Sequence, residues 1–309
     1  MILAYISGHE AVQTLIDAAA LGSVYALMAV GIGLVFGVLR IVNFAYGQLV
    51  MAGAFTLALT NDLNPALSIL VCFAVVIGLT VTMDVVAFRP LRRASPATML
   101  VATFAISLLL YYIALLKFTV QGKVVGTLTG LNRPIGDGQL LVRWIWVVDV
   151  GAAAVALGAV LLLLTKTNLG LHMRAAAADF RTARLLGVRA NSVILVAVLL
   201  SGALAAVVAV LLTAETPYVT PDYALRDTII VLVGVVVGGL DRLWSATLGG
   251  FAIGFVTQAL AGFLPSTGSW PFTSGVYLDS AVFTLVIVTL LLRPSGLFVR
   301  RTQRAVERV

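Results

Sequence analysis

The chain has 309 residues, of which 61% are apolar and only 11% are charged. A water-soluble domain carries about 25% charged residues, so this composition excludes a water-soluble globular protein and predicts an all-α polytopic membrane protein. The formal net charge of +7 is spread over short segments between apolar runs, which argues against a nucleic-acid-binding face.

Nine apolar segments follow one another along the chain. A membrane-spanning helix needs about 20 mostly apolar residues. The seventh segment is too short to cross as a regular helix, so it indicates a broken or re-entrant element, and eight helices plus a re-entrant loop is an open alternative. The whole chain, residues 1–309, is predicted to form one transmembrane domain. The nine segments are Ala11–Val38, Phe44–Thr60, Ala66–Phe88, Ala97–Leu116, Ile145–Thr165, Val193–Ala214, Thr228–Leu240, Ala246–Leu264 and Ser280–Leu292.

The distribution of Lys and Arg predicts the orientation in the membrane. Fifteen of the 20 basic residues follow the first, third, fifth and seventh segments or lie in the C-terminal tail. Basic residues are enriched on the cytoplasmic side, so we expect the N-terminus outside and the C-terminus inside the cytoplasmic (inner) membrane of a bacterium. The five basic residues on the opposite side are Lys117, Lys123, Arg133, Arg143 and Arg226.

Two connections on the predicted outer side are long. Lys117–Trp144 contains a Gly-Asp-Gly turn signal at residues 136–138, which predicts a small hairpin on the membrane surface. Pro265–Tyr277 is uncharged and rich in Ser, Thr, Gly and Pro. Each could dock an external partner or be a solvated connector.

Polar residues interrupt the apolar pattern after the first segment, in the sequence LRIVNFAYGQ of Leu39–Gln48. Asn43, Tyr46 and Gln48 would be costly facing lipid, and Gly47 breaks the run. We therefore expect these four residues to face a translocation pathway, a cytoplasmic gate or a neighbouring subunit. A plain cytoplasmic turn is the alternative.

No catalytic residue or metal ligand set is predicted. His9 and His172 are the two histidines and Cys72 is the one cysteine, and the chain has no phosphate-binding loop. Asp17 and Asp84 are the acids that we assign to spans, both near a boundary. The expected lack of a deep carboxylate argues mildly against an ion-driven carrier. Any energy from ATP has to come from another chain.

The predicted cytoplasmic segment 168–192 contains the sequence GLHMRAAAADFRTARLLGV. Its alanines favour a helix, and Gly187 is placed to cap the C-terminus of that helix. An apolar stripe recurs at three- and four-residue steps, with Arg174, Arg181 and Arg184 off it. This stripe could lie on the membrane surface or dock into a groove of a cytoplasmic partner. It consists of Met173, Ala176, Ala177, Phe180 and Ala183.

The same segment resembles the cytoplasmic coupling segment of branched-chain amino acid ABC permeases of the LivH type. That family has an Arg-Ala-x-Ala-x-Asp stretch followed by Leu-Leu-Gly. Leu21–Gln48, Gly238–Gly250 and Leu291–Phe298 are also similar to the family, in the expected order. Tyr46 and Gln48 stand where His and Glu are usual, and Asp241 and Arg242 stand where small residues are common. The matching coupling residues are Arg174, Ala175, Ala177, Asp179, Leu185, Leu186 and Gly187.

The resemblance implies a permease subunit that binds no cofactor itself. Its partners would be a second, LivM-type permease, two cytoplasmic LivG/LivF-type ATPases that bind ATP and Mg, and an external substrate-binding protein. The segment around 174–187 would be the coupling helix that docks on an ATPase. A permease for urea or short amides, and a stand-alone secondary carrier, remain alternatives. The residues implied in coupling are Arg174, Ala177, Asp179, Phe180, Arg181, Arg184, Leu186 and Gly187.

Overall fold

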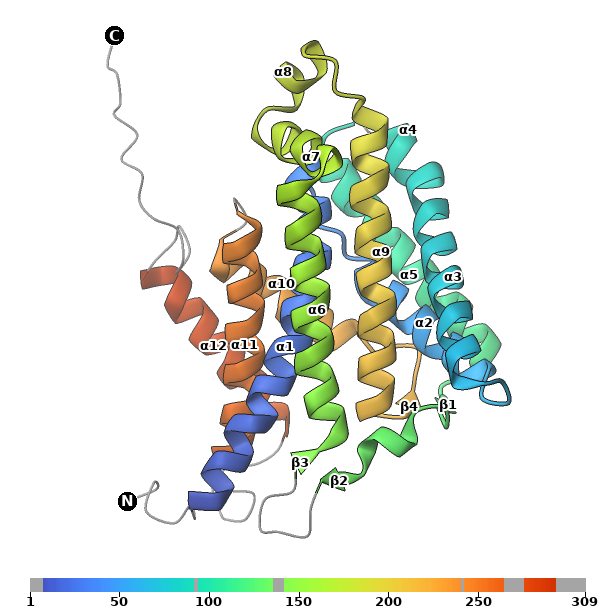
Figure 1. The fold of residues 1–309 in the computed structure, drawn as a ribbon, viewed down its shortest axis with the longest axis vertical. Coiled ribbons are helices and arrows are strands. Elements are labelled where there is room, and N and C mark those ends of the chain that lie inside the picture. Colours follow the sequence, from blue (N-terminus) through green and yellow to red (C-terminus); the bar gives the residue numbers. More distant parts are fainter. Residues whose placement is uncertain (1–7, 92–93, 136–141, 240–241, 264–274, 293–309) are drawn as a thin grey trace.

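The computed structural model describes residues 8–91, 94–135, 142–239, 242–263 and 275–292, and helices dominate this part of the chain (Figure 1). Each of the nine predicted apolar segments overlaps an α-helix, and the third also covers a π-helix. The nine α-helices are α1 Gly8–Leu39, α2 Tyr46–Leu59, α3 Pro65–Met83, α5 Pro96–Phe118, α6 Trp144–Lys166, α9 Ala190–Glu215, α10 Leu225–Gly238, α11 Leu243–Phe263 and α12 Gly275–Leu292. Shorter helices are the π-helix Asp84–Phe88, α4 Arg89–Leu91, the 3₁₀ turn Thr129–Asn132, α7 Asn168–Ala178 and α8 Phe180–Leu185.

Among the described residues, six helices are long and apolar enough to cross a membrane: α1, α3 with its continuation to Leu91, α5, α6, α9 and α11. The all-α polytopic class is thus confirmed, whereas the number of nine crossings stays a prediction. Both α2 and α10 have 14 residues and are about 21 Å long, against about 30 Å of bilayer core. The short length of α10 was expected from the sequence, but that of α2 was not.

The helix α2 is short because the chain returns from the end of α1 without helical structure. Arg40 has a φ of 55°, which ends α1, and α2 begins only at Tyr46. Non-helical backbone between membrane helices needs partners within the protein. One is supplied by α5, where the hydroxyl of Thr103 donates to the carbonyl of Val42 at 3.3 Å.

The helices α1 and α9 form the interior of the bundle. In their most apolar windows, 78% of α1 and 61% of α9 is buried, against 17–28% for α3, α5 and α6. Close packing of α1 on α11 depends on small residues, as is common between membrane helices. A Cβ atom added to Gly254 would lie 2.9 Å from the Cα of Gly22.

Short strands form at the end of the molecule opposite to α7 and α8 (Figure 1). The predicted hairpin is confirmed, because β2 (Pro134–Ile135) pairs antiparallel with β3 (Val142–Arg143). In the same connection β1 (Lys123–Val124) pairs with β4 (Tyr218–Val219) of the α9–α10 connection. The other predicted outer segment, 265–277, lies almost entirely outside the described residues.

Candidate functional site

The segment between α6 and α9 forms two helices beside the C-terminal end of α1 (Figure 1). Thr167 caps α7, because its hydroxyl accepts a hydrogen bond from the backbone N–H of Gly170 at 3.1 Å. Helix α7 ends at Ala178, and α8 begins at Phe180. The prediction of one continuous helix through Leu186 is therefore wrong.

Asp179 is the reason for the break. Its carboxylate accepts hydrogen bonds from the backbone N–H of Thr182 at 3.1 Å and from the hydroxyl of Thr182 at 2.6 Å. An Asp side chain that caps the next helix competes with continuation of the preceding one. The predicted C-terminal cap is confirmed, because Gly187 has a φ of 89°, a left-handed conformation that favours glycine.

Most of the predicted apolar stripe is buried within this chain. Met173, Ala176 and Ala183 are only 3–4% exposed. Met173 and Ala176 belong to the main core, and α7 packs on α1, α6 and α9. These three residues cannot insert into a partner, which corrects the expectation for the stripe. The side chains of Phe180 and Arg181 lie outside what the structure describes.

The most exposed apolar side chains of the segment lie instead at the end of α8, and Leu169 and Leu171 of α7 are about half exposed. Leu185 is 85% exposed and Leu186 is 80% exposed. Arg174 and Arg184 are also exposed, whereas Ala177 is half-buried. Helix α8 projects beyond the ends of the long helices (Figure 1), so this leucine pair is accessible to another molecule.

A hydrogen bond joins this segment to the interior helix α1. The guanidinium of Arg40 donates to the carbonyl oxygen of Ala177 in α7 at 2.6 Å. Because α7 also packs on α9, it contacts both interior helices of the bundle. A displacement of α7 would therefore act directly on α1 and α9.

The predicted pathway residues lie in the interior of the chain. Asn43, Tyr46 and Gln48 are at most 1% exposed. The side chain of Asn43 accepts a hydrogen bond from the backbone N–H of Ala45 at 3.0 Å and so shapes the entry to α2. None of the four residues lines the groove between α1, α6, α7 and α11. Their role in a pathway or gate remains a prediction.

Glycines bring the start of α2 against two other helices. A Cβ atom added to Gly31 of α1 would overlap the hydroxyl of Tyr46, and one added to Gly47 would lie 2.8 Å from the carbonyl oxygen of Ala224, just before α10. The Tyr46 hydroxyl and the Oε1 atom of Gln48 have no hydrogen-bond partner in the described part of the chain. Tyr46 thus lies against α1, and Gly47 lies against the start of α10.

Sequence reasoning missed one acid inside a span. Asp149 of α6 is 1% exposed, and both of its carboxylate oxygens lack a hydrogen-bond partner among the described residues. Asp149 therefore has to be added to Asp17 and Asp84, the two acids that were assigned to spans. Asp149 is a single acid in the apolar run WIWVVDVGAAA, and that pattern alone could have identified it.

Three other acids of the helices have partners. Asp84 is fully buried, and its carboxylate pairs with the Nε atom of Arg89 at 2.8 Å. Asp17 of α1 accepts a hydrogen bond from Gln13 at 3.0 Å. In α10, Asp227 accepts one from the hydroxyl of Tyr25 at 2.8 Å. No group of three or more His, Cys, Asp or Glu residues in the described ranges could hold a metal ion.

Comparison with known proteins gives one consistent family. The model of the family described as branched-chain amino acid transport system / permease component matches residues 14–291. The high-affinity branched-chain amino acid transport system permease protein BraD of Pseudomonas aeruginosa is 28% identical, over 94% of this chain and 97% of its own length. The corresponding protein LivH of Salmonella typhimurium is also 28% identical, over 93% and 95%.

A solved structure of a metal-chelate type ABC transporter in an inward-facing conformation aligns with 94% of this chain and 90% of its own, with a TM-score of 0.49 and 15% identity. The family match covers both interior helices, the segment of α7 and α8, and the start of α2. The chain is a multi-pass protein of the cytoplasmic membrane, and it belongs to the family of permease components of branched-chain amino acid transport systems.

Proposed function

We propose that this chain is the membrane-spanning subunit of an ATP-driven importer for branched-chain or other apolar amino acids. The observation that carries the proposal is the family match over residues 14–291, which includes the projecting α7–α8 segment. The chain binds no nucleotide itself in this proposal. Two cytoplasmic ATPases of the LivG/LivF type bind ATP and Mg, and an external binding protein delivers the amino acid.

In the proposed mechanism the α7–α8 segment docks on an ATPase. The exposed pair Leu185 and Leu186 supports this role, because it offers an apolar contact outside the membrane helices. Phe180 remains the predicted aromatic anchor of the same contact. When ATP binding draws the ATPases together, a docked α7 would pull on α1 through the bond between Arg40 and Ala177.

The proposal places α7 and α8 on the cytoplasmic side. At their end of the molecule lie Arg40, Arg89, Lys166, Arg174, Arg184, Arg189 and Arg242, whereas Lys117, Lys123, Arg133 and Arg143 lie at the other end, and Arg226 lies in the first turn of α10 (Figure 1). This asymmetry is the one expected of a protein whose basic loops face the cytoplasm. The β1–β4 and β2–β3 end would then face the binding protein.

A single permease chain forms half of a two-fold pathway in this proposal, and a LivM-type relative supplies the other half. Asn43, Tyr46, Gly47 and Gln48 are proposed to act at an inner gate, where α1, α2 and α10 meet. These residues are buried, and none of them lines the groove between α1, α6, α7 and α11. Their enclosure therefore supports a gate that opens by helix movement.

Purification of the complex from its native membrane tests the proposal. We expect the tagged chain to bring down two ATPase subunits, a second permease and a binding protein that carries a branched-chain amino acid. A binding protein that carries urea or a short amide would instead support the alternative substrate class. The transport mechanism would be unchanged in that case.

A stand-alone carrier driven by an ion gradient is the second candidate. One observation favours it: Asp149 is a buried carboxylate without a hydrogen-bond partner in the described chain, and such groups often carry protons or ions across membranes. A pure preparation of this chain that concentrates leucine under a proton gradient, without any ATPase, would establish the carrier.

A further inference from the structure

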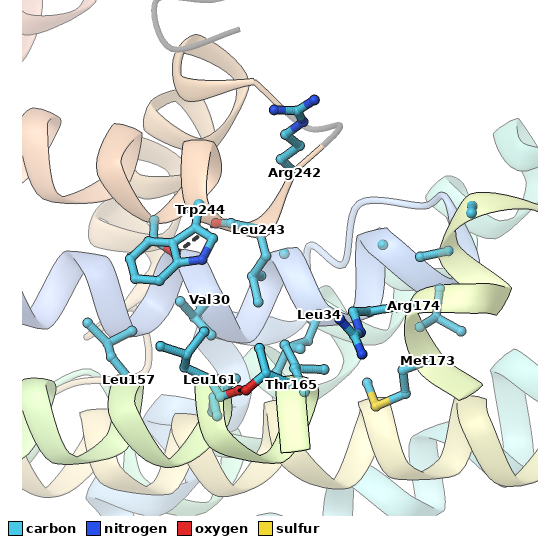
Figure 2. A pocket seen from close by; sticks show the side chains of 18 of the residues that line it. Val30, Leu34, Leu157, Leu161, Thr165, Met173, Arg174, Arg242, Leu243 and Trp244 are labelled. Atoms are coloured by element: carbon cyan, nitrogen blue, oxygen red, sulfur yellow. Dashed lines mark hydrogen bonds between the residues drawn. The ribbon is translucent and has the colours of Figure 1, made fainter. Parts of the chain in front are cut away.

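A groove of about 630 Å³ lies between the C-terminal halves of α1 and α6, the helix α7 and the start of α11 (Figure 2). Its size falls in the range of about 300–1,000 Å³ that is typical of small-molecule sites. The walls are apolar and come from three membrane helices. They include Val30, Leu34, Leu157, Leu161 and Leu243.

Three arginines line this apolar groove: Arg40, Arg174 and Arg242. Arg40 is bound to the carbonyl of Ala177, whereas Arg174 and Arg242 are exposed. Figure 2 shows Arg174 beside Leu34, and Arg242 at the edge near the start of α11 with its side chain directed away from the groove. The described residues that line the groove contribute these positive charges and no Asp or Glu.

The groove lies where membrane helices reach the interface. It extends to the last residues of α1 and α6, including Val38 and Thr165, where these spans end. Trp244 lines it and is 61% exposed. Tryptophan is enriched at the boundary between lipid and water, because its ring is apolar and its N–H is polar.

We propose that this groove binds one anionic phospholipid of the inner leaflet. Its phosphate would lie beside Arg174, the exposed side chain of Arg242 would turn in from the edge, and an acyl chain would cover the walls formed by α1, α6 and α11. Basic pockets between membrane helices on the cytoplasmic side select anionic headgroups. A free phosphate is a less suitable occupant, because it would leave the apolar walls uncovered. A two-fold-related copy of this chain is also less suitable, because it would bring a second set of the same positively charged arginines to the site.

The bound lipid would connect the membrane with the α7–α8 segment. Met173, Arg174 and Ala177 of α7 contribute to the groove together with residues of α1 and α11. The lipid would therefore hold α7 against the two membrane helices beside it. This inference rests on the proposed cytoplasmic side of α7 and α8, and not on which solute the protein carries.

Native mass spectrometry of the purified, delipidated complex tests the charge requirement. The probes are phosphatidylglycerol and phosphatidylcholine with identical acyl chains. We expect one phosphatidylglycerol to bind preferentially to this subunit. Arg242→Gln should weaken that binding about fivefold, because a basic residue near anionic headgroups contributes about 1 kcal/mol. The control Arg189→Gln removes an exposed charge at the same end, outside the groove lining, and should have little effect.

A second variant tests the apolar part of the site. Gly37 lines the groove, and a Cβ atom added there would meet nothing within 4 Å. Gly37→Leu should therefore fold normally, place its side chain in the groove and displace the phospholipid. Gly78→Leu makes the same change on α3, where an added Cβ also meets nothing within 4 Å, and should leave the lipid bound.

Three results would overturn the proposal. One is equal binding of phosphatidylcholine and phosphatidylglycerol to the unmodified complex. Another is an equal loss of phosphatidylglycerol in Arg189→Gln and Arg242→Gln, which would indicate a diffuse surface charge. The third is release of another protein subunit by Gly37→Leu while phosphatidylglycerol stays bound, which would assign the groove to a protein interface.

Discussion

Replacement of Leu186 by alanine is the sharpest test of the proposed contact with an ATPase. Leu186 is 80% exposed in this chain, so its truncation should leave the fold intact. The change removes three carbon atoms, and each buried CH₂ group contributes about 0.8 kcal/mol. If docking buries the part of Leu186 that is now exposed, the contact loses about 2 kcal/mol, which corresponds to an affinity about thirtyfold lower.

The assay compares ATPase binding and stimulated ATP hydrolysis with purified permease in lipid nanodiscs. Leu162→Ala is the matched control, because Leu162 is 59% exposed on α6 and does not belong to the α7–α8 segment. We expect Leu186→Ala to insert normally, to bind the ATPase about thirtyfold more weakly and to lose coupled hydrolysis. Unchanged affinity and coupling in Leu186→Ala would refute the assignment of the docking surface.

Three further predictions concern sidedness, buried charge and packing. The native Cys72 is buried and should not react with an impermeant thiol reagent. We expect this reagent to label Gly130→Cys from outside and to label Arg189→Cys only in opened membranes. The reverse labelling pattern would show that the orientation is inverted. Asp149→Asn should raise the free energy of unfolding by about 1–3 kcal/mol, measured as a higher thermal midpoint, because a neutral amide is less costly to bury without partners than a carboxylate. A lower thermal midpoint in Asp149→Asn would show that the Asp149 carboxylate has a stabilising partner. Gly47→Ala should lower the thermal midpoint, since its Cβ would overlap Thr228, whereas a matched Gly78→Ala should not; equal midpoints would mean that α2 can shift freely.

The sequence predicted the helical class because that class depends on composition and on apolar run length. Each predicted apolar segment overlaps a helix, and the Gly-Asp-Gly signal in the sequence located the hairpin whose strands β2 and β3 pair. The short length of α10 was also predicted, since Thr228–Leu240 has too few apolar residues to cross. In contrast, α2 is short because Arg40 leaves the helical conformation and the chain runs back without helix, which apolar periodicity does not reveal.

The structure of the segment between α6 and α9 could be predicted only in part from the local sequence pattern. Alanine-rich sequence predicted one helix, but the carboxylate of Asp179 caps α8 through Thr182 and ends α7. The apolar stripe at three- and four-residue steps predicted a buried face. The spacing could not tell whether Met173 would pack on another protein or on this chain's own helices. That distinction depends on tertiary packing.

The buried residues at the start of α2 illustrate the same limit. Polar character at Tyr46 and Gln48 predicted enclosure away from lipid, and both are buried. Only the structure shows that Tyr46 packs on Gly31 of α1 and that Gly47 lets the start of α2 approach α10. A role in gating still depends on movement of these helices.

The most direct test of the central claim is uptake of labelled leucine by proteoliposomes that contain the whole complex. We expect uptake only when ATP and Mg are enclosed with the ATPases and the binding protein is present outside. Leu186→Ala in the permease should reduce uptake and ATP hydrolysis together, whereas Leu162→Ala should change neither. Leucine accumulation by this chain alone, driven by an ion gradient without ATP, would contradict the account.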